Sequence, residues 1–411
     1  MPRNGFGGHE FGGCSDGRDR KPKRTIVKKN RMAYCLLRRV QIGILLALLP
    51  LTANAGRADE ANSAQADWPM FRGHPELTGV AKESLTPPLR VRWTVEADAP
   101  VEATAAIAGE TAYVVASDGR VMALRLKDGR TAWEVRLDTP VSASPAVHGG
   151  RLYIARADGR LTSLNANDGT RVWTYKTDGK LTASPTLAGD LVLIGSYDHK
   201  IHAVHAETGK RVWTYETGAP VHGTVAAARG LALASGCDGV LVMLDLKTGR
   251  LVREKDTGVH FATGPAIGQG QAWMGSVDGD YRLLRLENAG TIWHQDKDQR
   301  MGACHAQAAV TGNLGVFASR NRRIFALDAK QGERVWTFAT RDKADASPVI
   351  SGPIVYAAAD DGNLYALRLD SGKEVWRFAA GAAITASPAL GRGVLVIGTM
   401  DGAVYCLEAG E

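Results

Sequence analysis

Short apolar runs alternate with tight polar turns along this chain at a period of forty residues. In the unit between residues 141 and 175, the strands predicted from this alternation are 141–147, 152–155, 161–164 and 171–175. Asp158-Gly159 separates the second strand from the third. This pair is typical of two-residue hairpins, because glycine takes positive φ without strain. The pattern indicates one blade of four antiparallel strands per unit.

Two markers recur in step with the strands. Tryptophan occurs at Trp93, Trp133, Trp173, Trp213, Trp293, Trp336 and Trp376. A turn of the Asp-Gly type occurs eight times, at Asp118-Gly119, Asp158-Gly159, Asp198-His199, Asp238-Gly239, Asp278-Gly279, Asn321-Arg322, Asp361-Gly362 and Asp401-Gly402. A period near forty that is built from short strands and tight turns marks a β-propeller blade. We therefore predict an all-β fold, a single eight-bladed β-propeller of four-stranded antiparallel blades over residues 67–411.

The eighth unit stops before its outer strand. Residues 89–93, Leu-Arg-Val-Arg-Trp, carry the outer-strand pattern and stand alone ahead of the first complete unit. We expect this N-terminal strand to pair with the last blade, in the sheet that contains Tyr405. The ring would then close without an open sheet edge at the seam.

The repeated residues are interpreted as structural. A tryptophan that recurs once per blade can bury apolar area between neighbouring blades, and its indole N–H can bond a backbone carbonyl. One carboxylate per Asp-Gly turn supplies too few oxygens for calcium, so these pairs are interpreted as turns. Trp273 lies outside the period. A role in the core is favoured for it over a place on the floor of a cofactor pocket.

The formal net charge of +7 originates at the N-terminus. Residues 1–55 contain eleven Lys and Arg and three acids, a surplus of eight, so the remainder carries −1. A nearly neutral body gives no electrostatic reason to expect nucleic acid or an anionic membrane as a partner.

Residues 1–55 are predicted to be a leader with a signal peptide. Arg38-Arg39 precede an apolar run over 42–49, and Ala53 and Ala55 fit a signal-peptidase site. We expect cleavage near Ala55 and a soluble exported protein, periplasmic or extracellular, with an uncleaved anchor as the alternative. The apolar run is short for a membrane span, so we expect no integral membrane domain in the mature chain.

The start of the chain carries two further expectations. Residues 1–31 are long and polar for a leader, and Met32 would begin one of ordinary length, so Met32 is a candidate for the true start. Residues 56–66 are polar and lack periodicity, and they are expected to form a flexible tether. The aromatic segment that follows, from Trp68 to Gly73, is expected to pack against one end of the ring.

Three cysteines remain after the leader, Cys237, Cys304 and Cys406, in blades four, six and eight. An odd number spread over separate blades argues against a disulfide framework. No spacing among them suits zinc, so buried thiols and no metal site are expected. The mature protein is expected to be a monomeric propeller.

The position that varies most between units starts each first strand. Its occupants are Glu102, Ser142, Thr182, His222, Ala262, His305, Asp345 and Thr385. We expect these residues at the mouth of the central channel, with Lys180 and Lys343 close by. The candidate ligand-binding residues are Glu102, His222, His305, Asp345 and the loop residue His260. They could bind a cation or a polar ligand, or they could be solvated residues that line a water-filled channel.

Blade six departs most from the repeat. An irregular approach over 296–300 leads into it, and its hairpin reads Arg320-Asn321-Arg322-Arg323. Arg320, Arg322 and Arg323 are candidates for contact with a partner, because arginine is enriched at interface hot spots. A solvated hairpin is the alternative. His199, His202 and His205 are not expected to form a site, because neighbours three apart on a strand point to opposite faces.

The repeat resembles the pyrroloquinoline-quinone-type (PQQ-like) β-propeller family. Residues 207–213, Glu-Thr-Gly-Lys-Arg-Val-Trp, carry its outer-strand motif. Residues 67–73, Asp-Trp-Pro-Met-Phe-Arg-Gly, are similar to the entry segment of exported bacterial members. The resemblance covers roughly residues 67–411. It implies the fold but leaves the function open, because the repeat occurs both in quinone-dependent dehydrogenases and in BamB-like outer-membrane assembly propellers, which are non-catalytic scaffolds.

A dehydrogenase of this family implies adjacent cysteines near the cofactor and a calcium site with a catalytic aspartate. The sequence contains no Cys-Cys pair, nucleophile elbow, phosphate loop or zinc-protease motif. We therefore expect an exported scaffold or protein-interaction module with a protein partner in the cell envelope, no catalytic residues and no cofactor. The alternative is an oxidoreductase that uses PQQ with Ca²⁺, or a small-ligand sensor, at the top of the central channel.

Overall fold

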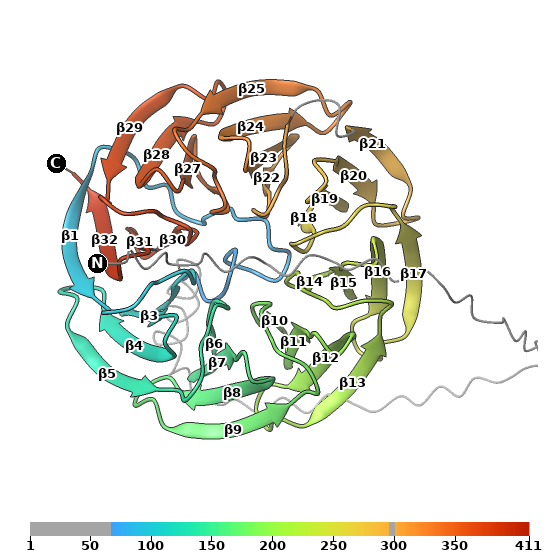
Figure 1. The fold of residues 1–411 in the computed structure, drawn as a ribbon, viewed down its shortest axis with the longest axis horizontal. Helices are drawn as coiled ribbons and strands as arrows, with labels where there is room; N and C mark the ends of the chain where they lie inside the picture. The colour runs from blue at the N-terminus through green and yellow to red at the C-terminus, as the bar shows by residue number, and fades with distance from the viewer. Residues whose placement is uncertain (1–66, 296–300, 411) are drawn as a thin grey trace, which may run out of the picture. The chain divides into compact units, whose positions relative to one another are not determined.

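The computed structural model of the chain describes residues 67–295 and 301–410. These residues form eight four-stranded antiparallel sheets arranged as blades in a ring (Figure 1). The predicted eight-bladed propeller is confirmed. The leader with its cleavage site, the tether over 56–66 and the approach over 296–300 lie outside the described residues.

The four strands of each blade follow one another from the channel outwards. Blades one to four consist of β2 (Ala106–Ala108), β3 (Thr111–Val115), β4 (Arg120–Arg125) and β5 (Thr131–Arg136); β6 (Ala146–His148), β7 (Arg151–Ala155), β8 (Arg160–Asn165) and β9 (Arg171–Lys176); β10 (Thr186–Ala188), β11 (Leu191–Gly195), β12 (Lys200–His205) and β13 (Arg211–Glu216); and β14 (Ala226–Ala228), β15 (Leu231–Ser235), β16 (Val240–Asp245) and β17 (Leu251–Asp256). Blades five to eight consist of β18 (Ala266–Gly268), β19 (Gln271–Gly275), β20 (Tyr281–Arg285) and β21 (Thr291–Gln295); β22 (Ala309–Thr311), β23 (Leu314–Ser319), β24 (Arg323–Asp328) and β25 (Arg334–Ala339); β26 (Val349–Ser351), β27 (Ile354–Ala358), β28 (Asn363–Arg368) and β29 (Glu374–Ala379); and β30 (Ala389–Gly391), β31 (Val394–Gly398), β32 (Ala403–Ala409) and β1 (Leu89–Glu96).

The inner strands are shorter than the sequence pattern predicts. In blade two the expected strand over 141–147 is reduced to β6, Ala146–His148, whereas the other three strands agree with the prediction to within one residue. The amide of Ser144 donates to Ser184 Oγ of the next blade at 3.0 Å, so it is not available to the ladder of its own blade. Pro145 has no N–H to donate. The residues ahead of the inner strand therefore connect blades.

The Asp-Gly turns have the expected left-handed backbone. Gly119, Gly159 and Gly239 have φ of 89°, 81° and 70°. The two departures from glycine keep this conformation, because His199 has φ of 63° and Arg322 has φ of 57°. The hairpin geometry is thus set by the fold and persists where the residue type is unfavourable.

The ring closes as the sequence predicts. β1 pairs antiparallel with β32, and Trp93 lies opposite Cys406 while Thr94 lies opposite Tyr405. Figure 1 shows β1, in blue, outside β32, in red. The first strand of the chain therefore completes the last blade.

The outer-strand tryptophans join neighbouring blades as expected. In six of the seven, the indole N–H donates to a backbone carbonyl of the following blade at 2.8–3.2 Å; these are Trp93, Trp133, Trp173, Trp213, Trp293 and Trp336. A glycine of that following blade lies on the indole face, as Gly209 does on Trp173. The glycine has no Cβ, and this lets the turn approach the ring closely.

We expect Gly209→Ala to lower the free energy of unfolding by about 2–4 kcal/mol. An added Cβ would lie 2.6 Å from the Trp173 ring, and the residue has φ of 69°. Gly230→Ala is the matched control, because Gly230 has φ of 76° but no atom within 4 Å of the added Cβ. Backbone strain alone should cost this control about 1 kcal/mol. Equal losses in urea denaturation would contradict the close contact with the indole.

Every outer strand also contains a register shift beside its pairing with the preceding strand. In β13 the shift leaves Val212 between two paired residues, and its side chain is 45% exposed. A bulge twists an edge strand and weakens its ability to pair with another chain. The rim of the ring therefore exposes apolar side chains on edges that are poorly shaped for sheet extension.

Residues 68–81, which we call the plug, cross the centre of the ring. The plug accepts hydrogen bonds of 2.7–2.9 Å from the inner strands of six blades, which come from the amides of Ile107, Val147, Ala227, Ile267, Val310 and Ile350. Figure 1 shows this segment in blue inside the ring. Asp67 and Glu83 flank the plug and accept hydrogen bonds from Gly109 and Gly393, in the turns that follow the inner strands.

The plug fills one end of the channel. Trp68, Met70, Arg72 and Leu77 are buried, and Arg72 Nη2 donates to the carbonyl of Ala308 at 2.9 Å. We call the end where the inner strands finish the plug face, and the opposite end the mouth face. Packing of the aromatic segment against the ring is confirmed. At the plug face the buried side chains of the plug occupy the channel.

Candidate functional site

The mouth face is organised by a ring of main-chain hydrogen bonds. In each blade an amide after the second strand donates, at 2.8–3.4 Å, to a carbonyl in the connection that enters the inner strand. These pairs, amide first, are Ser117 and Pro100, Ala157 and Pro140, Tyr197 and Lys180, Cys237 and Pro220, Val277 and His260, Arg320 and Ala303, Asp360 and Lys343, and Met400 and Ala383. In each blade this bond holds the end of the second strand against the entry segment. The residue that supplies the carbonyl lies two positions before the variable residue identified from the sequence.

A second set of hydrogen bonds starts two residues after the variable residue, in the entry segments of blades one, two, six and seven. Thr104 N donates to Ser144 Oγ at 3.0 Å, and Gln307 N donates to Ser347 Oγ at 2.9 Å. Blade five has Gly264 at this position, and its backbone lies against the carbonyl of Thr224 in blade four. The rigid scaffold beneath the mouth thus depends on small residues.

Asp345 belongs to a charged network between blades six and seven, and His305 lies near enough for Asp345 and Arg320 to affect its pKa. The Arg320 guanidinium bonds both carboxylate oxygens of Asp345, at 2.9 and 3.0 Å. Lys343 Nζ lies 3.4 Å from Asp345 and 3.4 Å from Asp360. Two cations and two carboxylates offset one another in this network, so its acids are already engaged.

Burial and the Arg320 charge lower the pKa of His305 to about 4, against the opposing effect of Asp345. The imidazole is therefore neutral at pH 7. Burial also raises the pKa of Asp360, although Lys343 opposes this rise.

His222 lies elsewhere, between blades three and four. Lys180 Nζ is 4.0 Å from the centre of the Tyr197 ring, and the His222 ring meets the Tyr197 ring edge-on at 4.4 Å. Burial and the Lys180 charge lower the pKa of His222. We call this group, Lys180 with Tyr197 and His222, the Lys180 corner.

The remaining candidates do not join either group. His260 is half exposed, and its Nδ1 lies 3.4 Å from Asp278 Oδ2. Glu102 is partly buried and makes no ion pair within the described residues. The predicted mouth residues therefore form separate groups around the ring.

The mouth acids are poorly suited to calcium. Asp345 and Asp360 each lie beside a cation of the chain, and a bound Ca²⁺ would have to displace or tolerate Arg320 and Lys343. Within residues 67–295 and 301–410, no group of three His, Cys, Asp or Glu side chains is arranged to hold a metal ion. Asp345 and Asp360 are therefore not free ligands for the Ca²⁺ of the quinone site that the family resemblance suggests as an alternative.

The three arginines of blade six differ in their surroundings. Arg320 is turned towards Asp345, whereas Arg322 sits exposed in the left-handed hairpin position and Arg323 is partly buried at the start of β24. Arg322 is thus the member most open to a partner.

The three histidines of blade three lie in different surroundings. His202 is buried and lies 3.1 Å from Asp198 and 2.9 Å from the Tyr175 hydroxyl, while His199 is exposed in its hairpin. Trp273 is buried beside Trp293, with ring centres 5.6 Å apart, which places it in the core.

Two of the cysteines have core surroundings as well. Cys304 and Cys406 are buried, and burial raises the pKa of both thiols to about 12. Cys237 is partly buried.

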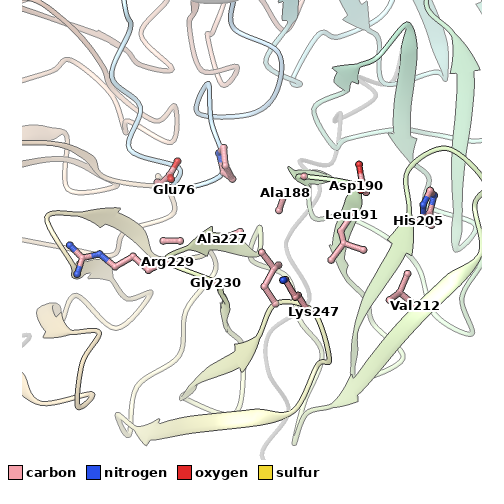
Figure 2. A pocket seen from close by; sticks show the side chains of 14 residues that line it. Glu76, Ala188, Asp190, Leu191, His205, Val212, Ala227, Arg229, Gly230 and Lys247 are labelled. Atoms are coloured by element: carbon pink, nitrogen blue, oxygen red, sulfur yellow. The ribbon is translucent and has the colours of Figure 1, made fainter. Parts of the chain in front are cut away.

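A groove on the plug face, between blades three and four, has no counterpart in the sequence pattern. It has a volume of about 610 Å³, and its apolar lining includes Pro75, Ala188, Leu191, Val212 and Ala227. Figure 2 shows Glu76 and Arg229 on one side of it and His205 on the other. Small residues of this kind occur throughout the repeat, so no sequence signal distinguishes the groove.

We expect acid to destabilise the fold partly through His305. Its pKa is about 4 in the folded chain and about 6.5 when unfolded. Between these values the unfolded chain takes up a proton that the folded chain does not, so stability falls as pH falls through this window. His305→Gln should reduce the difference in unfolding free energy between pH 7.5 and pH 5 in urea denaturation. The exposed His148→Gln is the control, and an equal reduction in both variants would contradict this account.

No helix among the described residues has the length and apolar character needed to cross a membrane. None of the curated proteins matches the chain in sequence. The family model described as outer membrane protein assembly factor BamB matches residues 89–140, 126–259 and 278–409.

Solved structures share the fold at low identity. BamB from Moraxella catarrhalis is 17% identical with a TM-score of 0.67, over 78% of this chain and 98% of that one. Quinohemoprotein alcohol dehydrogenase from Comamonas testosteroni is 15% identical with a TM-score of 0.71, over 87% of this chain and 83% of that one. The computationally designed Ika8 protein is 15% identical with a TM-score of 0.67, over 80% of this chain and 98% of that one. These likenesses show the fold alone, whereas the sequence model identifies the family. The chain belongs to the family described as outer membrane protein assembly factor BamB.

Proposed function

We propose that this protein is an exported, non-catalytic propeller that binds a protein partner in the cell envelope and acts in the assembly of outer-membrane proteins. The observation that carries this proposal is the match of the BamB family model to three stretches that together span most of the ring. The assembly role is taken from the printed name of that family. The proposal includes cleavage of the leader near Ala55 and a soluble mature protein.

The mouth face supports a scaffold better than a quinone enzyme. Its two acids between blades six and seven are bound to Arg320 and Lys343, so they are not placed to receive Ca²⁺. The ion pairs of this face hold its charged side chains in place, and a partner of complementary charge and shape can recognise such a surface.

The test uses the tagged mature protein as bait in chemically cross-linked envelope extracts. We expect repeated capture of the same protein partner. The computationally designed Ika8 protein, which has the same fold, serves as the control bait and should not capture that partner. Failure to recover any partner above this control, over repeated preparations, would overturn the scaffold proposal.

A parallel assay addresses the alternative enzyme. PQQ and Ca²⁺ are added to the purified protein, and dye-linked oxidation of alcohols and sugars is followed. We expect neither binding nor turnover. Cell fractionation with mass spectrometry of the N-terminus tests export, and a start at Gly56 is the expected result.

A further inference from the structure

We propose that the Lys180 corner binds a carboxylate of a protein partner, with the ammonium of Lys180 as its ionic contact and the rings of Tyr197 and His222 as the surface beside it. This inference rests on the proposed function and adds the chemistry by which the partner is recognised. Lys180 in blade three occupies the same backbone position as Lys343 in blade seven, but the two lysines have different neighbours.

The scaffold places Lys180 and Lys343 in the same way. Tyr197 N donates to the Lys180 carbonyl at 3.1 Å, and Asp360 N donates to the Lys343 carbonyl at 3.0 Å. Both lysines therefore enter an inner strand from the same backbone position, in blades three and seven. Their different surroundings result from the residues around them.

In blade seven the chain itself supplies carboxylates to this lysine. Lys343 Nζ lies 3.4 Å from Asp345 and 3.4 Å from Asp360. In blade three the equivalent positions carry Thr182 and Tyr197. The scaffold thus accommodates a carboxylate beside the lysine in one blade and leaves that carboxylate out in the other.

Lys180 makes no ion pair among the residues that the structure describes. Its ammonium instead lies 4.0 Å from the centre of the Tyr197 ring. The ring covers one side of the charge without neutralising it, and the remaining side is exposed at the mouth. A carboxylate that approaches from the channel would form an ion pair with the Lys180 ammonium, which the Tyr197 ring holds in place from its other side.

His222 makes the corner selective for one negative charge. Its ring packs edge-on against Tyr197 at 4.4 Å, and burial together with Lys180 lowers its pKa, so it is neutral near pH 7. Lys180 is then the charged group of the corner. One carboxylate with an apolar neighbour satisfies this surface, because the neighbour can rest on the two rings.

The test measures binding of three labelled, acetylated peptides of equal length, rich in glycine and phenylalanine, by fluorescence anisotropy. One contains an internal glutamate and an amidated end. The second contains glutamine and a free C-terminal carboxylate, and the third contains glutamine and an amidated end. We expect at least tenfold tighter binding of one or both carboxylate peptides than of the neutral peptide. The two carboxylate peptides distinguish a side chain from a chain terminus as the source.

Lys180→Ala should weaken carboxylate binding at least tenfold, and Lys180→Arg should retain most of it. The control is Lys127→Ala, which removes an exposed lysine from the plug face and should change nothing. Histidine NMR titration gives an independent readout, because loss of the Lys180 charge should raise the pKa of His222. Unchanged binding in folded Lys180→Ala, or equal binding of all three peptides, would overturn the proposal.

Two outcomes separate this inference from the scaffold function. If the bait with Lys180→Ala captures the envelope partner as well as the unaltered protein does, the scaffold stands and the Lys180 corner is not its contact. If PQQ binds at the corner and supports oxidation with Ca²⁺, both proposals are wrong.

Discussion

A chain that begins at Ala97 is expected to form no stable monomer. It lacks β1, and β32 then presents an unpaired edge over Ala403–Ala409. The loss also removes the buried side chains of Leu89 and Trp93, each of which contributes roughly 1.5–3 kcal/mol by burial. Such a chain has lost most of the few kcal/mol that a folded domain holds in reserve.

The measurement is thermal unfolding by circular dichroism, with size-exclusion chromatography to detect association through the exposed edge. A chain that begins at Leu89 is the comparison, because it lacks the plug but keeps the closing strand. We expect an intermediate stability for it, and the difference between the two truncations isolates the contribution of β1. If the chain that begins at Ala97 is a monomer and melts at the same temperature as the chain that begins at Leu89, ring closure by β1 does not contribute to stability.

Gly264→Ser is expected to destabilise the fold by at least about 3 kcal/mol, although serine is the commonest residue at this position of the repeat. An added Cβ would lie 1.8 Å from the backbone carbonyl oxygen of Thr224. A backbone atom cannot move aside as a flexible side chain can, so blades four and five would have to separate. The loss is measured by urea denaturation.

Ser184→Gly is the reciprocal control at the equivalent position of blade three. It removes the hydroxyl that accepts the amide of Ser144 at 3.0 Å, and it should cost about 1–3 kcal/mol because that buried amide loses its partner. A stabilised Gly264→Ser variant would mean that the repeat consensus, and not the local backbone spacing, governs this interface.

Much of the ring could be predicted because its turns and its contacts between blades require particular residue types, which recur in the sequence. The left-handed turns need glycine or a residue that tolerates its conformation, and His199 and Arg322 show that position in the repeat suffices to identify them. The indole of Trp93 donates to the carbonyl of Leu126 and packs against Gly129, and the repeat places a carbonyl and a glycine at these positions in each following blade. The closing strand was recognisable because it carries the same motif.

The course of the plug could not be predicted from the sequence. It is held by main-chain hydrogen bonds, such as that from Ile107 N to the Trp68 carbonyl, and any residue can accept such a bond. The inner strands were predicted too long for a similar reason. Alternating small and polar residues such as those over 141–145 look like a strand, yet the amides of Val141 and Ser144 donate to neighbouring blades.

The sequence indicated which residues lie at the mouth face, but not which side chains they contact there. His305 and Asp345 were identified from one variable position, but Asp360 and Tyr197 come from a second variable position after the second strand, which only the hydrogen-bond ring relates to the first. Comparing that second position across the units would have found both residues. Their pairing with particular cations depends on side-chain direction, which the period does not specify.

The plug changes how the ring can evolve and melt. In a simple array each repeat senses only its immediate neighbours, so units can be duplicated, lost or frayed one at a time. In this protein six of the repeats donate hydrogen bonds to the plug, and they do so in the same order along the plug as along the chain, from Ile107 to Ile350. Inserting or deleting a blade would shift every later repeat out of step with its place on the plug. The number of blades is therefore fixed by a segment that belongs to none of them.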